Sequence, residues 1–319
     1  QSPSRCLLTS FPRSLPFPLS MIHAVHDPAN IHRRAIALGR LLGWRRTILL
    51  RIRNDPVDVL CSPGRGNRKG KPHVFLSAGI HGDEPAGVEA LLSYFEQKPH
   101  WTAEFTFTLV PLLNPWGLRH NSRLNEEGLD LNRSFQQGEL PLIRELCTLY
   151  DRRGPFDLAL LLHEDYDACG IYLYETGPRG EVGFGEEILS RVSSWCPVDP
   201  RDRIEGRKHR NGILVRPLRK KWFEKIGLPE AAHLHFHGCR RVFTIETPSE
   251  FDVGLRVKAH MEAIDAALSL LAASRPSADA LAHPPAPRRP KDALSARALL
   301  PSTAPAQNGE NRSDQSRSV

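Results

Sequence analysis

Four apolar segments of this chain each end in a polar side chain of a kind that binds metals or substrates. The segments and the residues that follow them are 74–80 with His81, 105–113 with Asn114, 156–162 with His163, and 241–245 with Glu246. Short apolar runs bounded by turn residues are typical of buried strands. In open α/β sheets, sites form at the edge where the carboxyl ends of the strands lie. The chain is therefore constrained to a sheet with a polar edge, and we expect a functional site there.

Strand-like and helix-like segments alternate along most of the chain. The expected strands are 73–79, 105–113, 156–163, 171–175 and 241–246, and the expected helices are 84–97, 139–150, 184–194, 228–236 and 254–272. Before them, a helix around Asn30–Leu42 precedes a strand over Thr47–Cys61 that Asp55-Pro56 interrupts. This alternation predicts an α/β fold with a mixed, mostly parallel central sheet and helices on both faces. Residues 196–227 are expected to be irregular and are a candidate specificity insertion.

Composition suggests one domain with tails. A chain of 319 residues with 40% apolar residues can bury one large core. We expect residues 1–21 to be a disordered or non-native leader, with Met21 as a candidate start, because Pro and Arg interrupt its apolar runs. Residues 22–272 are expected to form the domain that carries the site. Residues 273–319, rich in Pro, Ala, Ser and Arg, are expected to be a disordered tail.

His81 and Glu84 stand three residues apart where an expected strand gives way to an expected helix. At such a turn, an imidazole nitrogen and a carboxylate oxygen can face one ion. Both are ligands of catalytic zinc, which takes three protein ligands and leaves a fourth position open. Alone, this pattern is more often a surface turn. Because three other expected strands also end in polar residues of this kind, a metal site is the preferred interpretation.

A stretch of polar residues, Arg123-Leu-Asn-Glu-Glu-Gly-Leu-Asp-Leu-Asn-Arg-Ser-Phe135, follows the second of these strands. Taken in order, these motifs resemble the zinc metallocarboxypeptidase family, the carboxypeptidase A-like enzymes, over roughly residues 70–270. The murein-peptide amidase branch and the succinylglutamate desuccinylase/aspartoacylase branch are the nearest in pattern. The resemblance implies a zinc carboxypeptidase-like fold of the phosphorylase/hydrolase-like kind and one bound Zn²⁺.

The resemblance also implies a role for each matched residue. These roles are metal binding for His81, Glu84 and His163, binding of a substrate carboxylate for Asn132 and Arg133, transition-state stabilisation for Arg123, and general-base catalysis for Glu246. The mobile tyrosine of the family has no clear counterpart among Tyr166, Tyr172 and Tyr174.

The chemistry of these side chains agrees with those roles. Zinc brings the pKa of bound water toward neutrality, and a carboxylate such as Glu246 can take the proton. A cation near the scissile carbonyl, for which Arg123 is our choice, typically contributes ~3–4 kcal/mol to transition-state stabilisation. The planar fork of Arg133 suits a carboxylate, and Asn132 adds an amide donor. Asp130 is expected to orient the ring of His81.

Taken singly, most of these residues have a simpler explanation. Asp-Leu-Asn-Arg could be a solvated turn, His163 a core histidine and Glu246 half of a strand-end ion pair. A rival metal cluster is His233-Leu-His235-Phe-His237, whose alternation would put three rings on one face of a strand. The sequence before it favours a helix with only His233 and His237 aligned, so the zinc site at His81 is preferred.

The net charge of +7 is partly concentrated in residues 207–221. This segment is either a solvated loop or a basic rim that attracts anionic substrates. Aromatic residues are sparse around it, so we expect no nucleic-acid partner. No segment is long and apolar enough for a membrane span. The six cysteines show no paired spacing, so we expect reduced thiols and a cytoplasmic protein. The sequence leaves the oligomeric state open.

Together these features predict a zinc-dependent metallocarboxypeptidase that hydrolyses an amide bond next to a carboxylate-bearing residue. Its partner would be a peptide or an N-acyl amino acid with a free carboxylate. The alternative is an N-acyl amino acid deacylase of the succinylglutamate desuccinylase/aspartoacylase type, and a non-enzymatic binding module is a further rival. Asn114-Pro-Trp-Gly and the spacing from Arg123 to Asn132 favour the peptidase.

Overall fold

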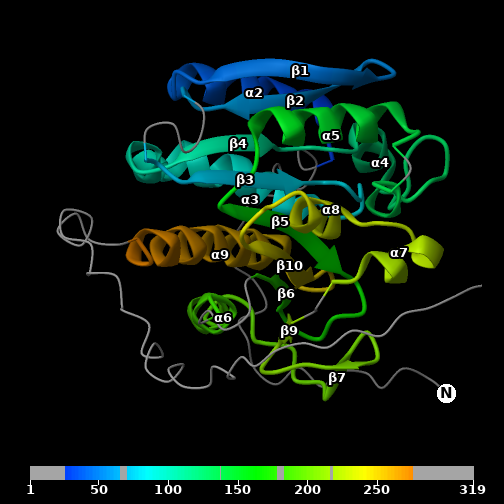
Figure 1. Ribbon diagram of the computed structural model, residues 1–319, viewed down its shortest axis with the longest axis vertical. Coiled ribbons are helices and arrows are strands. Elements are labelled where there is room, and N and C mark those ends of the chain that lie inside the picture. The colour runs from blue at the N-terminus through cyan, green and yellow to red at the C-terminus, as the bar shows by residue number, and fades with distance from the viewer. Residues whose placement is uncertain (1–25, 65–69, 137, 178–182, 216–217, 276–319) are drawn as a thin grey trace, which may run out of the picture. The chain divides into compact units, whose positions relative to one another are not determined.

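The computed structural model describes residues 26–64, 70–136, 138–177, 183–215 and 218–275 (Figure 1). The chain divides into two units, Gln1–Arg275 and Pro276–Val319. The expected leader and nearly all of the expected tail lie outside the described residues. Those two expectations therefore stay predictions.

An eight-stranded sheet runs in the order β1-β2-β4-β3-β5-β10-β6-β9 (Figure 1). The strands are β1 (Arg45–Ile52), β2 (Asp55–Cys61), β3 (His73–Ala78), β4 (Thr106–Val110), β5 (Leu158–Asp165), β6 (Tyr172–Thr176), β9 (Ile213–Val215) and β10 (Val242–Pro248). The central strands β4, β3, β5 and β10 are parallel to one another. The strands β2 and β6 join this centre in antiparallel fashion. The predicted mixed, mostly parallel sheet is confirmed.

The central strands are buried along nearly their whole length, as their sequences predict. Every residue of β3 and β4 is buried, and in β5 only the last residue, Asp165, is partly exposed. Parallel strands that are covered on both faces have continuous apolar sequences of this kind. His163 and Glu246 lie toward the carboxyl ends of β5 and β10, whereas smaller polar residues such as Ser77 and Thr108 are buried within β3 and β4.

Helices cover both faces of the sheet, as predicted. They are α2 (Pro28–Leu41), α3 (Pro85–Gln97), α4 (Pro115–His120), α5 (Pro141–Arg153), α6 (Gly185–Val192), α7 (Lys220–Ile226), α8 (Glu230–Phe236) and α9 (Val253–Ala273). One apolar cluster joins α2, α3, α6 and α9 to the sheet. A second cluster, under α5 and α8, lies on the other face. Asp27 and Asp252 cap α2 and α9 by accepting bonds from backbone N–H groups at the first turn.

Two parts of the chain differ from the prediction. The segment Thr47–Cys61 is an antiparallel pair, β1 and β2, because the chain reverses at Arg53 (φ 53°) just before Asp55. The segment 196–227, expected to be irregular, contains β9, α7 and a short antiparallel pair, β7 (Arg203–Ile204) and β8 (Arg207–Lys208). These elements are too short to give a periodic sequence signal, so the sequence alone could not indicate them.

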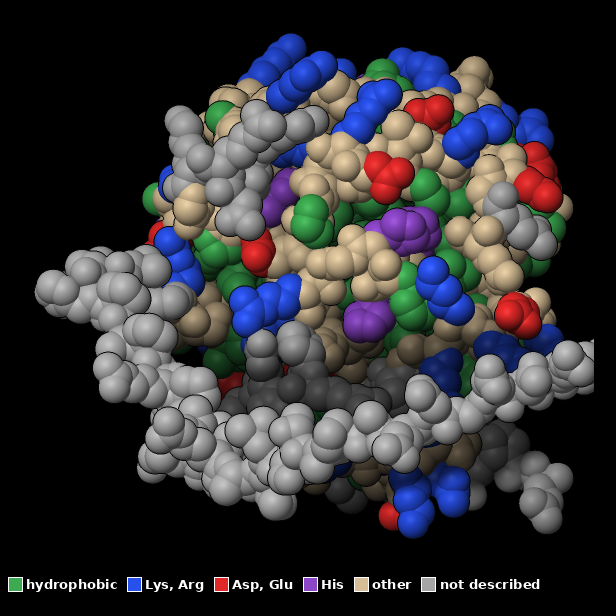
Figure 2. Space-filling view, in the orientation of Figure 1, with side chains coloured by type: hydrophobic (Ala, Val, Ile, Leu, Met, Phe, Trp, Pro, Cys, Tyr) green, Lys and Arg blue, Asp and Glu red, His purple; other side chains and the backbone are tan. Residues whose placement is uncertain are grey.

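Lysine and arginine side chains are spread over much of the face in Figure 2. Cys61, Cys147, Cys196 and Cys239 are free thiols, as expected, whereas Cys169 is disulfide-bonded, contrary to the expectation. Among the described helices, none has the length and apolar character needed to cross a membrane.

Candidate metal centre

The turn after β3 brings His81 and Glu84 to the sheet edge. It is held by backbone bonds from Asn114 N to Gly79 O (2.8 Å) and from Gly82 N to Ser122 O (2.9 Å). A side chain at Gly82 would place its Cβ 1.9 Å from the backbone of Gly117, so only glycine fits there. The tight turn ends at Glu84, directly before Pro85 opens α3. The close approach of the Gly82 and Gly117 backbones therefore fixes the turn that carries His81 and Glu84.

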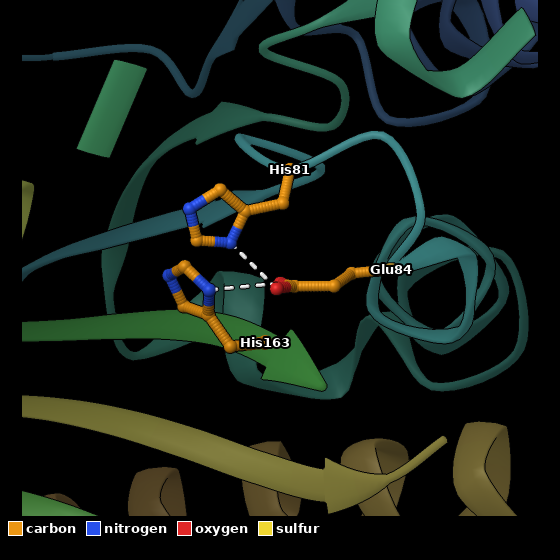
Figure 3. A group of neighbouring side chains, drawn as sticks. All are labelled: His81, Glu84 and His163. Atoms are coloured by element: carbon orange, nitrogen blue, oxygen red, sulfur yellow. Dashed lines mark hydrogen bonds and ion pairs between the residues drawn. The ribbon is translucent and has the colours of Figure 1, made fainter. Parts of the chain in front are cut away.

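His81, Glu84 and His163 place one ligand atom each within 4.8 Å of one another, and all three residues are buried. The Nδ1 atoms of His81 and His163 lie 2.5 and 2.8 Å from the two carboxylate oxygens of Glu84. Figure 3 shows both rings turning a nitrogen toward this carboxylate. Two imidazole nitrogens and a carboxylate that converge on one point form a donor set that zinc accepts. The three residues predicted as ligands thus lie together in the structure.

The electrostatics of this group fit a site for a cation. Burial works to raise the pKa of the Glu84 carboxyl, but His81 and His163 outweigh it and hold that pKa far below its usual range. Burial works to lower the pKa of His81, yet Glu84 and Asp130 raise it to about 9. The pKa of His163 is raised in the same way by Glu84. Glu84 thus favours positive charge on both rings, and a divalent cation bound there would supply that positive charge instead.

Asp130 and Arg123 lie on the outer side of His81. Asp130 Oδ1 is 3.3 Å from His81 Nε2, the nitrogen that does not face Glu84. Arg123 donates to Asp130 Oδ2 at 3.0 Å and lies 3.6 Å from Glu84 Oε1. A carboxylate on the far nitrogen fixes the orientation of a ligating imidazole. The structure therefore places Asp130 beside His81, as the sequence predicted. Arg123 lies at the solvent side of the group, with 42% of its side chain exposed.

Glu246 reaches the same site from β10. In the parallel pairing it lies opposite His163, and in the antiparallel pairing it lies opposite Tyr172. Burial raises the pKa of the Glu246 carboxyl to about 8, with His163 opposing and Glu84 adding to the rise. A carboxyl with such a pKa can both take and release a proton near neutral pH.

Asn132 and Arg133 form a single turn of 3-10 helix (Leu131–Arg133) beside the site. Asp130 caps this turn, because its Oδ1 accepts from Asn132 N at 2.9 Å. Arg133 is exposed and donates to the backbone carbonyl of Asn132 at 2.8 Å. The turn thus places the side chains of Asn132 and Arg133 beside the metal-binding group. Asp130, which caps the turn, also contacts His81.

A cavity of about 180 Å³ is lined by all seven residues predicted for the site. Tyr172 and Tyr174, two of the three tyrosines considered from the sequence, also line it. Lining residues that the sequence did not indicate include Thr176, Leu218, Phe223, Ile226, Ala232 and Thr244. A second cavity of about 660 Å³ shares Glu84, Arg123, Glu164, Asp165 and Glu205 with the first, so the cleft continues past the metal ligands. Alternation along β6 and β10 could have indicated Thr176 and Thr244, but nothing in the sequence indicated α7.

The other two sequence candidates are the histidine cluster at His233 and the basic segment 207–221. Within the described residues, His81, Glu84 and His163 form the single group with metal-binding geometry, so the rival cluster at His233 is not supported. In that cluster, the rings of His233 on α8 and of His237, the C-cap residue of α8, stack with centroids 4.0 Å apart, as the helical interpretation predicted. In the basic segment 207–221, Arg207 and Lys208 lie on β8 and line neither cavity, whereas Leu218 lines the first. Arg216 lies outside the described residues, so the basic rim stays a prediction.

Part of the chain matches a known family model. The model of the succinylglutamate desuccinylase/aspartoacylase catalytic domain matches residues 70–181. No curated protein matches the chain.

Solved structures share the fold. A protein of Shewanella amazonensis described as a metallopeptidase has a TM-score of 0.67 and 23% identity, over 77% of this chain and 94% of that one. A metallo-carboxypeptidase from Burkholderia cenocepacia has a TM-score of 0.57 and 18% identity, over 77% and 69%. A metallo-carboxypeptidase from Pseudomonas aeruginosa, in complex with (2-guanidinoethylmercapto)succinic acid, has a TM-score of 0.56 and 16% identity, over 77% and 68%. The chain therefore has the zinc carboxypeptidase-like fold, and its residues 70–181 match the succinylglutamate desuccinylase/aspartoacylase catalytic domain.

Proposed function

We propose that this protein is a zinc-dependent metallocarboxypeptidase that hydrolyses an amide bond next to a carboxylate-bearing residue. One observation carries the proposal. The convergent donor atoms of His81, Glu84 and His163 lie in the wall of a cavity that also contains Glu246, Arg123 and Arg133. One metal site, one proton-transfer group and two cations are the parts that amide hydrolysis of this kind needs.

Zinc held by His81, Glu84 and His163 would act as a Lewis acid and supply a nucleophilic water at neutral pH. Glu246 then holds the proton of that water and returns it to the leaving amine. Its buried position favours this task, because a raised pKa makes the Glu246 carboxylate a stronger base than an ordinary glutamate. Arg123, at the mouth beside Glu84, is placed to stabilise negative charge that develops on the scissile carbonyl oxygen.

Arg133 and Asn132 bind the carboxylate of the substrate in this proposal. Both line the cavity, and Arg133 makes no ion pair within the described residues. Its Nη1 donates to Asn132 O, so the other N–H groups of the guanidinium can bind a ligand. The relative from Pseudomonas aeruginosa binds a substituted succinic acid, a ligand whose carboxylates suit such a clamp. A bidentate arginine contact recognises carboxylate geometry that a lysine cannot match.

Cleft length supports a peptide over a small N-acyl amino acid. The second cavity continues from the first across Glu84 and Arg123, which gives room for substrate on both sides of the metal ligands. An N-acyl amino acid would leave the larger cavity empty. The family model of residues 70–181 includes deacylases, so N-succinylglutamate and N-acetylaspartate are the substrates to compare.

The test is turnover by zinc-loaded protein on a panel of peptides with free carboxyl termini, beside the two N-acyl amino acids. We expect hydrolysis of peptides, loss of activity with a chelator, and recovery when zinc is restored. The Glu246→Gln protein is the control for contaminating peptidases. Exclusive turnover of an N-acyl amino acid would instead show the deacylase, and zinc binding without turnover of any substrate would indicate a binding module.

A further inference from the structure

Glu230 is a buried carboxylate that the proposed mechanism does not use. It is 0% exposed and begins α8. Its neighbours in sequence, Pro229 and Ala231, line the cavity of the metal centre. A buried carboxyl group needs hydrogen-bond partners, since an unsatisfied one destabilises the fold. Its partners show what the side chain holds in place.

Two hydroxyl groups donate to the carboxylate of Glu230. Ser77 Oγ donates to Oε2 at 3.0 Å, and the hydroxyl of Tyr150 donates to Oε1 at 2.5 Å. Ser77 belongs to β3, the strand that leads to His81, and Tyr150 belongs to α5. The first turn of α8 is therefore tied to the sheet and to a second helix through one side chain.

The backbone of Glu230 holds the side chain of Asn132. Glu230 N donates to Asn132 Oδ1 at 2.9 Å. Because a backbone N–H can only donate, the amide oxygen of Asn132 must face it, and Nδ2 must point the other way. Nδ2 makes no hydrogen bond within the described residues, and Asn132 lines the cavity. The two N–H donors of this amide are thus left for a ligand.

The surrounding backbone reinforces this contact. Phe135 N donates to Leu228 O at 3.1 Å, next to a β-bridge between Ser134 and Leu228. A side chain at Gly227 would place its Cβ 2.2 Å from Arg133 O, so the two segments touch at the backbone. A shift of the first turn of α8 would therefore be passed directly to the Asn132–Arg133 turn.

We propose that Glu230 is a positioning residue for the carboxylate clamp. Its bonds to Ser77 and Tyr150 fix the first turn of α8, and the N–H of that turn fixes the Asn132 amide with its donors toward the substrate carboxylate. This inference rests on the proposed function, because it assigns an effect on the binding of a free carboxylate.

The experiment compares a peptide substrate with its C-terminally amidated form. In Glu230→Ala, the turn loses its anchor, and we expect KM for the free acid to rise about tenfold, the effect of one hydrogen bond to a charged group. The turnover of the amidated peptide and the zinc content should stay as in wild type. Glu230→Gln keeps the length and an acceptor for Tyr150, so it should restore the wild-type preference.

The matched control is Glu224→Ala, the same change at an exposed position on α7 that lines neither cavity. Equal losses on free and amidated peptides in Glu230→Ala would show a merely structural role and overturn the proposal, as would an unchanged preference.

Crystal structures of wild type and Glu230→Ala give a readout that does not depend on the reaction. We expect the contact from residue 230 N to Asn132 Oδ1 to be lost or the amide to turn, and an unchanged contact refutes the positioning role. If the wild-type enzyme does not distinguish free from amidated peptide, the carboxylate clamp of the proposed function fails, and these structures still decide the role of Glu230.

Discussion

Glu246 and His163 lie directly opposite each other on the parallel strands β10 and β5. One is the proposed proton-transfer group and the other a proposed metal ligand. Their relative position is set by sheet register, which a loop could not fix as firmly. On the other side of β10, the antiparallel register places Tyr172 opposite Glu246. The reacting groups are therefore held by adjacent strands at one sheet edge.

Removing a ligand should remove the metal. We expect purified protein to bind about one equivalent of zinc, and His163→Ala to lose most of it, because two donors cannot hold a site built for three. Metal analysis after dialysis measures this. His233→Ala is the control, since that ring lies on α8 outside the ligand group, and it should keep its zinc. Equal zinc content in His163→Ala and wild type would exclude His163 as a ligand.

Glu246→Gln should abolish turnover and leave the metal in place. Glutamine has nearly the same shape but cannot accept a proton from water, and general-base catalysis is typically worth about 10²–10⁴-fold in rate. The measurements are kcat and zinc content on the same preparation. A rate within a few fold of wild type would remove Glu246 from the mechanism, and loss of zinc would give it a structural role.

Arg133→Lys tests the carboxylate clamp. Lysine keeps the charge but loses the two-pronged geometry, so kcat/KM for a free-carboxylate peptide should fall about 10-fold or more, with little change in stability. Amidation of the substrate should cause a similar loss in wild type. The two losses should not add, because both remove one interaction. Full additivity would mean that Arg133 contacts another part of the substrate.

Zinc affinity should rise with pH. The pKa of His81 is raised to about 9 in the metal-free protein, so its ring carries a proton at neutral pH that zinc must displace. Between pH 6 and pH 8, the affinity should therefore increase, and the gain should level off as pH passes about 9. Competition with a chelator at several pH values measures it. An affinity independent of pH would contradict the protonated state of this histidine.

Acid should destabilise the fold through a buried histidine far from the site. Burial, with help from Arg153, lowers the pKa of His73 to about 4, so the folded state favours the neutral ring. In the unfolded chain the ring takes up a proton below a pKa of ~6.5, so its contribution is present above that pH and is lost as pH falls toward 4. The loss is about 3 kcal/mol in the free energy of unfolding.

Denaturant unfolding of metal-free wild type and His73→Gln at pH 7, 6, 5 and 4 measures this contribution. The difference between the two proteins should shrink as pH falls. His120→Gln changes an exposed ring and is the control. A constant difference across this range would show that His73 does not titrate on unfolding.

The sequence alone determined the sheet edge and the chemistry gathered there. Strands covered on both faces are rich in apolar residues, so charged and imidazole side chains stand near the strand ends. For that reason His81, His163 and Glu246 could be placed at strand ends from their apolar neighbours. The order of the motifs then indicated one metal and one carboxylate clamp.

Only the tertiary structure decided what surrounds the metal group. The wall that includes Phe223 and Ile226 comes from α7, a helix of 7 residues without a periodic signal. The contact between Asn132 and Glu230 joins residues 98 positions apart. Such contacts depend on how helices pack on the sheet, and no local pattern encodes that packing. The sequence thus indicated which groups to propose for the site, whereas long-range packing decided how they are oriented.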